Sequence, residues 1–370
     1  MYFSVLQPLY HRQMESYILA DDLEQARASL LKLNEELGRF DAQKVDERAN
    51  FTQVQENNQL ILANILGKLG RHGEAARLVE PAMKKLLRTH FIPTNLLVNY
   101  AGSLEQNLRT NLEFLVEDGK VAEAEDLVND AMIHLDAILV GHPGAEELIL
   151  TTKIRLFTNI GNLFLNQEDY RHASQFFGQA QLAYEATKAS SWVSHGPTMI
   201  PYFIAEIKGY YASDPKRARI KEELLRNNLR KGLYTNSVQG SQHLYHIALA
   251  TAVLDEELKL GKKQKAQEAY DRLLQLHLQH DASEDEKRFI GFSWQVWNIL
   301  SVRRLRAKML LALAKYEVEY LLKEPQQCRL TRRRVRQAIA GINPQEKTTF
   351  TAKANEEINI LRQQLVNCGK

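Results

Sequence analysis

Polar and apolar residues do not alternate over any sustained stretch of this chain, and its runs of β-branched residues are short. Strands are usually marked by one of these two patterns. Leucine, alanine, glutamate, glutamine, lysine and arginine dominate instead, all of which favour helices, and only nine of the 370 residues are proline. The pattern predicts an all-α fold.

A small residue recurs at a constant interval and marks an internal repeat. Ala26, Ala75, Ala124 and Ala173 are each 49 positions apart. Turn signals precede three of them, namely LGRHG, EDGKV and NQEDY. A period of about 20–50 residues is typical of stacked repeats, in which each unit buries its apolar face only against its neighbours. The sequence therefore predicts an array of helical units rather than a single core.

The best-defined unit covers residues 154–187 and reads IRLFTNIGNLFLNQEDYRHASQFFGQAQLAYEAT. It resembles the tetratricopeptide repeat (TPR), a helix–turn–helix with small and aromatic residues at fixed positions. The positions that carry the resemblance are Phe157, Ile160, Gly161, Phe164, Asp169, Tyr170, Ala173, Phe177 and Ala180. Closely crossing helices need small residues, so Gly161 and Ala173 are expected to face each other. The three phenylalanines are expected to fill the groove to the next helix.

Other segments share this spacing. Units at 7–39, 56–89 and 105–138 are in register with it, and weaker ones follow near 199–232 and 247–280. Because the family unit has about 34 residues, the 49-residue period predicts that both helices of each unit are longer than the family's.

The resemblance implies a right-handed α-solenoid of about six TPR-like helix–turn–helix units. A long helix from about Glu284 to Leu322 and a basic helical tail are expected to follow. We expect the solenoid to occupy residues 1–322 and the tail residues 323–370. The aromatic-rich segment 190–211 interrupts the period and is interpreted either as a loop that gates the groove or as a connector on the convex side.

In a TPR array the first helix of each unit lines the concave wall. The resemblance therefore implies that a ligand is contacted by Asn64, Lys68, Arg109, Glu113, Glu117, Asn162 and Asn166. Asparagine suits a peptide backbone because its side chain both donates and accepts hydrogen bonds. The family's clamp for chaperone tails is disfavoured, since Glu15 and Glu113 would repel the two carboxylates that it holds. The alternative is that these residues are ordinary solvated side chains.

The C-terminal part is basic. Residues 301–370 carry 15 Lys or Arg and 6 Asp or Glu, a net charge of +9, whereas the rest of the chain carries −6. On a helix, one face would hold a basic stripe of Arg329, Arg332, Arg333 and Arg336. Such a stripe suits an acidic protein partner, nucleic acid or an anionic membrane surface. Alternatively, it is a solvated face or neutralises the acidic body. A final amphipathic stretch, with Ala352, Ile358, Leu361 and Leu365 on one side, either caps the array or binds a partner.

Signatures of catalysis are missing from the sequence. It has no phosphate-binding loop, no G-x-S-x-G, no H-E-x-x-H and no C-x-x-C. The histidine pairs His243/His246 and His277/His280 lack further ligands in the sequence pattern and are interpreted as surface or groove residues. We therefore expect a chain that is not an enzyme and that carries no cofactor and no metal.

Two features bear on the compartment. No segment is apolar enough for a transmembrane helix, and no basic region precedes the first apolar residues, so neither a membrane span nor a secretory signal is expected. The cysteines, Cys328 and Cys368, are too few for a disulfide framework, which favours the reducing cytoplasm.

The favoured interpretation is a scaffold or adaptor that binds a peptide or a partner helix in the concave groove. A peptide- or ligand-sensing regulator is the first alternative. Binding of nucleic acid or an anionic surface through the basic stripe is the second.

Overall fold

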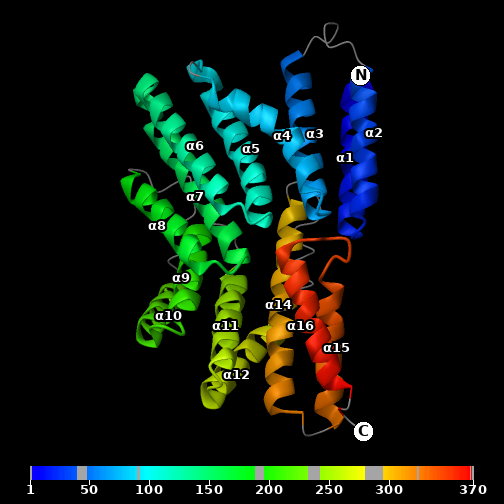
Figure 1. Cartoon of the computed structure of the whole chain (residues 1–370), viewed down its shortest axis with the longest axis vertical. Helices are drawn as coiled ribbons and strands as arrows, with labels where there is room; N and C mark the ends of the chain where they lie inside the picture. Colours follow the sequence, from blue (N-terminus) through cyan, green and yellow to red (C-terminus); the bar gives the residue numbers. More distant parts are fainter. Residues whose placement is uncertain are drawn as a thin grey trace. The chain divides into compact units, whose positions relative to one another are not determined.

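The computed structural model describes residues 2–39, 48–89, 92–187, 196–231, 242–279, 295–322, 325–366 and 368. Within these residues the chain is almost entirely helical and contains no strand, which confirms the predicted all-α class (Figure 1). The contacts divide the chain into two compact units. Unit 1 comprises residues 1–167, 176–193 and 344–348, and unit 2 comprises residues 168–175, 194–343 and 349–370.

Unit 1 consists of successive helical hairpins in which a first helix packs on a second. The helices are α1 (Tyr2–Leu19), α2 (Leu23–Gly38), α3 (Arg48–Lys68), α4 (His72–Leu87), α5 (Leu97–Glu117), α6 (Val121–Gly141), α7 (Glu146–Asn166) and α8 (Tyr170–Ala186). The division between the units falls inside α8. Short 3-10 turns at Thr94–Leu96 and Pro143–Ala145 lead into α5 and α7. First helices also pack on each other, α3 on α5 and α5 on α7, as expected for a stacked repeat.

The backbone itself repeats every 49 residues. The first helices α3, α5 and α7 end at Lys68, Glu117 and Asn166. Each of the first four hairpins turns at a residue with positive φ: Asp21 (61°), Gly70 (75°), Gly119 (74°) and Glu168 (64°). Two of these are glycine, which adopts this conformation without steric cost. The period predicted from the alanines is therefore also the period of the interhelical turn.

The fourth residue of each second helix is small and buried. In chain order these residues are Ala26, Ala75, Ala124, Ala173, Ala218, Ala266 and Cys328, none of them more than 2% exposed. Because the position is shared by every hairpin of the described residues, the repeat extends beyond the segment where the sequence shows it clearly.

Gly161 on α7 makes room for an aromatic ring of α8. A Cβ atom on Gly161 would lie 2.8 Å from the ring of Phe177. That Gly161 also faces Ala173 stays a prediction. Phe176 of α8 stacks on Phe164 of α7, with ring centroids 5.5 Å apart, so aromatic side chains also pack within this hairpin.

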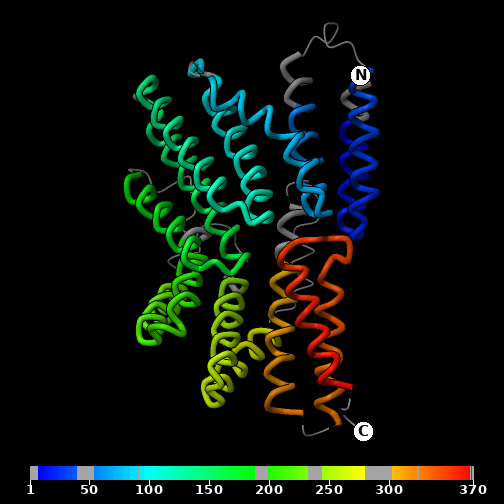
Figure 2. The backbone as a smooth tube through the Cα atoms, viewed as in Figure 1, coloured from blue at the N-terminus to red at the C-terminus, as the bar shows by residue number. Residues whose placement is uncertain are grey.

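Unit 2 continues the hairpin pattern with α9 (Gly196–Tyr210), α10 (Pro215–Arg230), α11 (Gln242–Lys259), α12 (Lys263–Gln279), α14 (Gln295–Tyr320), α15 (Pro325–Ala340) and α16 (Thr349–Leu365). The pairs are α9 with α10, α11 with α12 and α14 with α15, and α16 packs on both α14 and α15 (Figure 2). The described part of the predicted long helix, α14, and the first helix of the basic tail, α15, thus form a further hairpin; residues 284–294 lie outside the described part. The domain boundary predicted at residue 322 stays a prediction.

Two sequence interpretations need correction here. Within the segment 190–211, residues Gly196–Tyr210 form α9, the first helix of a hairpin, rather than a gating loop or a connector; residues 190–195 lie outside the described part. In the final stretch, Ala352 is exposed and Ala354 takes its place on the buried face. Asp214 caps the start of α10, since its carboxylate accepts a 3.1 Å hydrogen bond from the Arg217 N–H.

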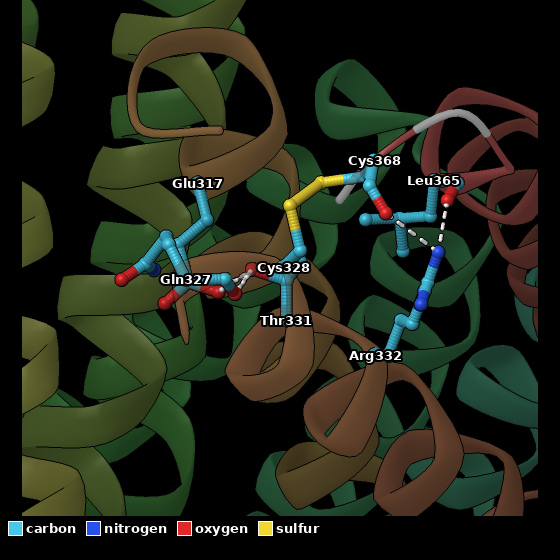
Figure 3. The surroundings of a disulfide bond; sticks show 7 residues. All are labelled: Glu317, Gln327, Cys328, Thr331, Arg332, Leu365 and Cys368. Carbon is cyan, nitrogen blue, oxygen red and sulfur yellow. Dashed lines mark hydrogen bonds between the residues drawn. A yellow bond between two sulfur atoms is a disulfide. The ribbon is translucent and has the colours of Figure 1, made fainter. Parts of the chain in front are cut away.

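The two cysteines form a disulfide, contrary to the expectation from their number. Cys328 at the start of α15 is bonded to Cys368, 40 residues later, with the Cα atoms 5.8 Å apart (Figure 3). The inference of a reducing compartment assumed unpaired cysteines and therefore loses its basis.

Candidate partner-binding surfaces

Three predicted residues occupy the same point on successive first helices of unit 1. Asn64 on α3, Glu113 on α5 and Asn162 on α7 are 49 residues apart and each is half-buried. We call these three residues the polar row. The Asn162 amide donates a 2.9 Å hydrogen bond to the carbonyl of Thr158 within its own helix, which orients its side chain. In the polar row, the Glu113 carboxylate lies between the two amides along the packed first helices.

One helical turn further on, the predicted residues are Lys68, Glu117 and Asn166. Asn166 is exposed and Glu117 half-buried, but Lys68 is only 7% exposed. Its Nζ lies 2.8 Å from Oε1 of Glu346, and its carbonyl accepts a 2.6 Å hydrogen bond from the Lys347 N–H. Lys68 therefore holds residues 344–348 within unit 1 and does not present an open binding surface.

Arg109, the remaining predicted contact, is exposed on α5. It lies near Glu105, whose pKa is raised by burial, while Arg155 on α7 acts in the opposite direction. Arg155 Nη1 is 3.6 Å from Oε2 of Glu105. Sequence reasoning missed Glu105 and Arg155, although Arg155 precedes Asn162 by seven residues and so lies on the same helical face.

Unit 2 contains a larger group of charges that the sequence did not indicate. We call it the charged cluster: Glu168, Lys208, Asp255, Glu256, Lys259, Arg304, Lys308, Lys315, Lys353 and Glu357. Asp255 on α11 lies 3.8 Å from Lys208 of α9 and 3.8 Å from Lys315 of α14. Lys315 in turn is 2.6 Å from Glu357 of α16. Ion pairs thus connect four helices of this unit.

Lys308 differs from the other lysines of the charged cluster. Within the described part of the chain it has no carboxylate at ion-pairing distance, and its ammonium lies 5.3 Å from the centroid of the Phe350 ring. Its side chain reaches solvent. Desolvation of the ammonium by the neighbouring helices, together with the charge of Lys208, lowers the pKa of Lys308 to about 8. No sequence signal pointed to it, because the 49-residue register is lost in this part of the chain.

The basic stripe is exposed, as its spacing predicts. Arg329, Arg332, Arg333 and Arg336 all reach solvent on α15. Arg332 also has an internal role, since its Nη2 donates hydrogen bonds to the carbonyls of Leu365 (2.8 Å) and Cys368 (2.9 Å) (Figure 3). The neighbouring Arg334 is buried instead and forms an ion pair with the fully buried Glu317.

No group of three or more His, Cys, Asp or Glu side chains that could hold a metal ion occurs in the described residues. The His243 side chain and His280 lie outside this part of the chain. None of the described helices combines the length and the apolar character needed to cross a membrane.

Neither a protein-family model nor a curated protein sequence matches the chain. Among solved structures, it is similar to a tetratricopeptide repeat protein from Parabacteroides merdae, with 12% identity, a TM-score of 0.44, and coverage of 98% of this chain and 99% of that one. At this level of similarity the comparison identifies neither a partner nor an activity. The helical hairpins, whose first four turns recur every 49 residues, form the TPR-like repeat that the sequence predicts.

Proposed function

We propose that the chain is an interaction scaffold that binds a peptide or a partner helix along the first helices of unit 1. The observation that carries this proposal is the register of α3, α5 and α7, which end 49 residues apart and place Asn64, Glu113 and Asn162 at equivalent points. A binding surface of this kind grows by repetition, and each unit adds one set of contacts.

The chemistry of the polar row suits a polypeptide. Amide side chains donate and accept hydrogen bonds, as a peptide backbone does, and their half-burial strengthens such bonds relative to those in water. The exposed Arg109 and the carboxylate of Glu113 select the charge of the partner's side chains. Lys68 is not part of this surface because Glu346 already neutralises it.

Site-specific photo-crosslinking tests this proposal. A photoreactive phenylalanine analogue at position 109 is expected to capture one defined partner segment in cells, whereas the same analogue at Asn129, exposed on the second helix α6, is not. The captured segment is then synthesised and its affinity measured by fluorescence anisotropy. Arg109→Ala and Asn162→Ala are expected to weaken binding about tenfold each, and Asn129→Ala to leave it unchanged.

Equal crosslinking from positions 109 and 129 would contradict the proposal. So would a partner whose affinity is the same for wild type and for the Arg109→Ala and Asn162→Ala variants. Either result would exclude the first helices of unit 1 as the binding surface.

A further inference from the structure

A small hollow lies between α15 and the C-terminal end of α16 in unit 2. Its volume is about 280 Å³, and it is lined by Arg332, Val335, Arg336, Arg362, Leu365 and Val366. Val335 and Leu365 are each 3% exposed and form an apolar floor. The three arginine side chains are exposed and line the same hollow. We call this feature the arginine hollow.

The arginine hollow is strongly basic. Among the described residues, three guanidinium groups line it and no carboxylate does. Within the described residues, neither Arg336 nor Arg362 has a carboxylate at ion-pairing distance. Like charges brought together in this way repel one another unless an anion is added. The other two arginines of the basic stripe, Arg329 and Arg333, do not line the hollow.

Arg332 and the disulfide hold the wall of the hollow in place. Arg332 donates hydrogen bonds to the carbonyls of Leu365 and Cys368, at 2.8 and 2.9 Å. Cys368 is in turn bonded to Cys328 on α15, so the chain after α16 is tied to α15 at two points (Figure 3). A site ordered before binding loses less entropy when a ligand enters.

We propose that the arginine hollow binds the carboxylate of a small organic anion that carries one apolar group. The guanidinium groups of Arg336 and Arg362 bind the carboxylate, because planar guanidinium groups form paired hydrogen bonds with it. The apolar group packs on Val335 and Leu365. The volume lies just below the range of about 300–1,000 Å³ for pockets that enclose a drug-sized ligand, so the ligand is about the size of one amino acid.

Two kinds of ligand carry a carboxylate beside an apolar group: a free carboxylic acid, and the C-terminal residue of a peptide. Phenylacetate and the peptide acetyl-Gly-Ser-Gly-Phe both carry a carboxylate beside a benzyl group and serve as probes of the two kinds. Binding to the full chain is measured by calorimetry and by ligand-observed NMR. The amidated peptide and 2-phenylethanol lack the carboxylate and are expected to bind at least tenfold more weakly than their acids.

Variants locate the site. Arg336→Gln and Arg362→Gln are each expected to weaken binding of the acids at least tenfold. Arg329→Gln and Arg333→Gln remove the same charge from the same stripe outside the hollow and are expected to change binding less than twofold. Circular dichroism checks that each variant retains its helices; all four side chains are exposed.

The proposal is overturned if neither acid binds at millimolar concentration, or if the amidated peptide binds as tightly as the free one. It is also overturned if Arg329→Gln weakens binding as much as Arg362→Gln, since the stripe would then act as diffuse charge. Binding of duplex DNA or phosphatidylserine vesicles that depends on Arg329 and Arg333, with no binding of the acids, would likewise replace it. Tighter binding of phenylacetate than of the peptide identifies a free acid as the ligand, and the reverse identifies a peptide terminus.

Discussion

The ammonium of Lys68 lies 2.8 Å from the carboxylate of Glu346, and both side chains are almost completely buried. The two residues are 278 positions apart in the sequence. The same contact region includes Gln345, whose side-chain oxygen accepts a 3.2 Å hydrogen bond from the Glu24 N–H at the start of α2. Residues 344–348 are therefore anchored on the hairpin turns of unit 1 through polar contacts.

Removing one member of this pair should be costly, because the other is left as an unpaired buried charge. Lys68→Met is expected to lower the free energy of unfolding by about 3–5 kcal/mol, measured by urea denaturation. The double variant Lys68→Met/Glu346→Leu is expected to recover much of that loss. As a control, Glu35→Gln disrupts the exposed pair with Arg39 and should cost no more than about 1 kcal/mol. A loss for Lys68→Met no larger than the control's would show that the pair is solvated.

The hydrogen bond between Tyr211 and Glu257 gives a second prediction. The Tyr211 hydroxyl donates to Oε1 of Glu257 at 2.6 Å, and burial followed by this bond raises the pKa of Tyr211. Tyr211→Phe is expected to cost about 1.5–3 kcal/mol, the range for a hydrogen bond to a charged group. Thermal or urea unfolding measures the loss. Tyr17→Phe, at a long and exposed bond, should change stability by less than about 0.5 kcal/mol; equal losses would remove the special role of Tyr211.

Gly161 should not tolerate a side chain. A Cβ atom there would lie 2.8 Å from the Phe177 ring, so Gly161→Ala is expected to destabilise unit 1 by about 1–3 kcal/mol through overpacking. A Cβ atom on Gly178, in α8, would meet no other atom within 4 Å. Gly178→Ala is expected to stabilise the helix by about 0.5–1 kcal/mol. Thermal unfolding of both variants measures the difference, and destabilisation of similar size in the two would contradict a specific role for the ring contact.

The disulfide should contribute to stability. A disulfide that closes a loop of 40 residues lowers the conformational entropy of the unfolded chain. In the chain-entropy model this stabilises the fold by about 4 kcal/mol. Dithiothreitol is expected to lower the unfolding midpoint of the wild type but not that of Cys328→Ala/Cys368→Ala. Alanine fits at position 328, since the equivalent residue of the other hairpins is alanine. Identical wild-type midpoints with and without the reductant would show that the bond does not stabilise the fold.

The lowered pKa of Lys308 predicts that the stability of the fold depends on pH. Its pKa falls from 10.5 to about 8 on folding, through burial and then the charge of Lys208. Between these values the unfolded chain binds more protons than the folded chain, so this group makes stability rise with pH. Lys308→Met carries no such proton and is expected to exceed the wild type in stability at pH 7. The advantage should shrink as the pH rises from about 8 towards 10.5; a constant difference in urea midpoints between pH 7 and pH 10 would contradict it.

The sequence by itself determined the repeat. Ala26, Ala75, Ala124 and Ala173 predicted a 49-residue unit, and the turns with positive φ carry the same period. The local sequence Asp214-Pro215 is also typical of a helix start, and the Asp214 carboxylate caps the backbone of α10. These features were readable because each depends on residues within one hairpin, and because repetition makes a weak local pattern visible.

Only the tertiary structure decided which polar residues reach solvent and which hold the fold. Lys68 matched the pattern of a groove residue, yet Glu346 neutralises it from a segment far along the chain. The pairing of Cys328 with Cys368 and the four-helix charged cluster depend in the same way on distant residues. Periodicity shows which face of a helix is polar. It does not show which charge packs against that face, because that charge comes from a helix or segment outside the 49-residue repeat.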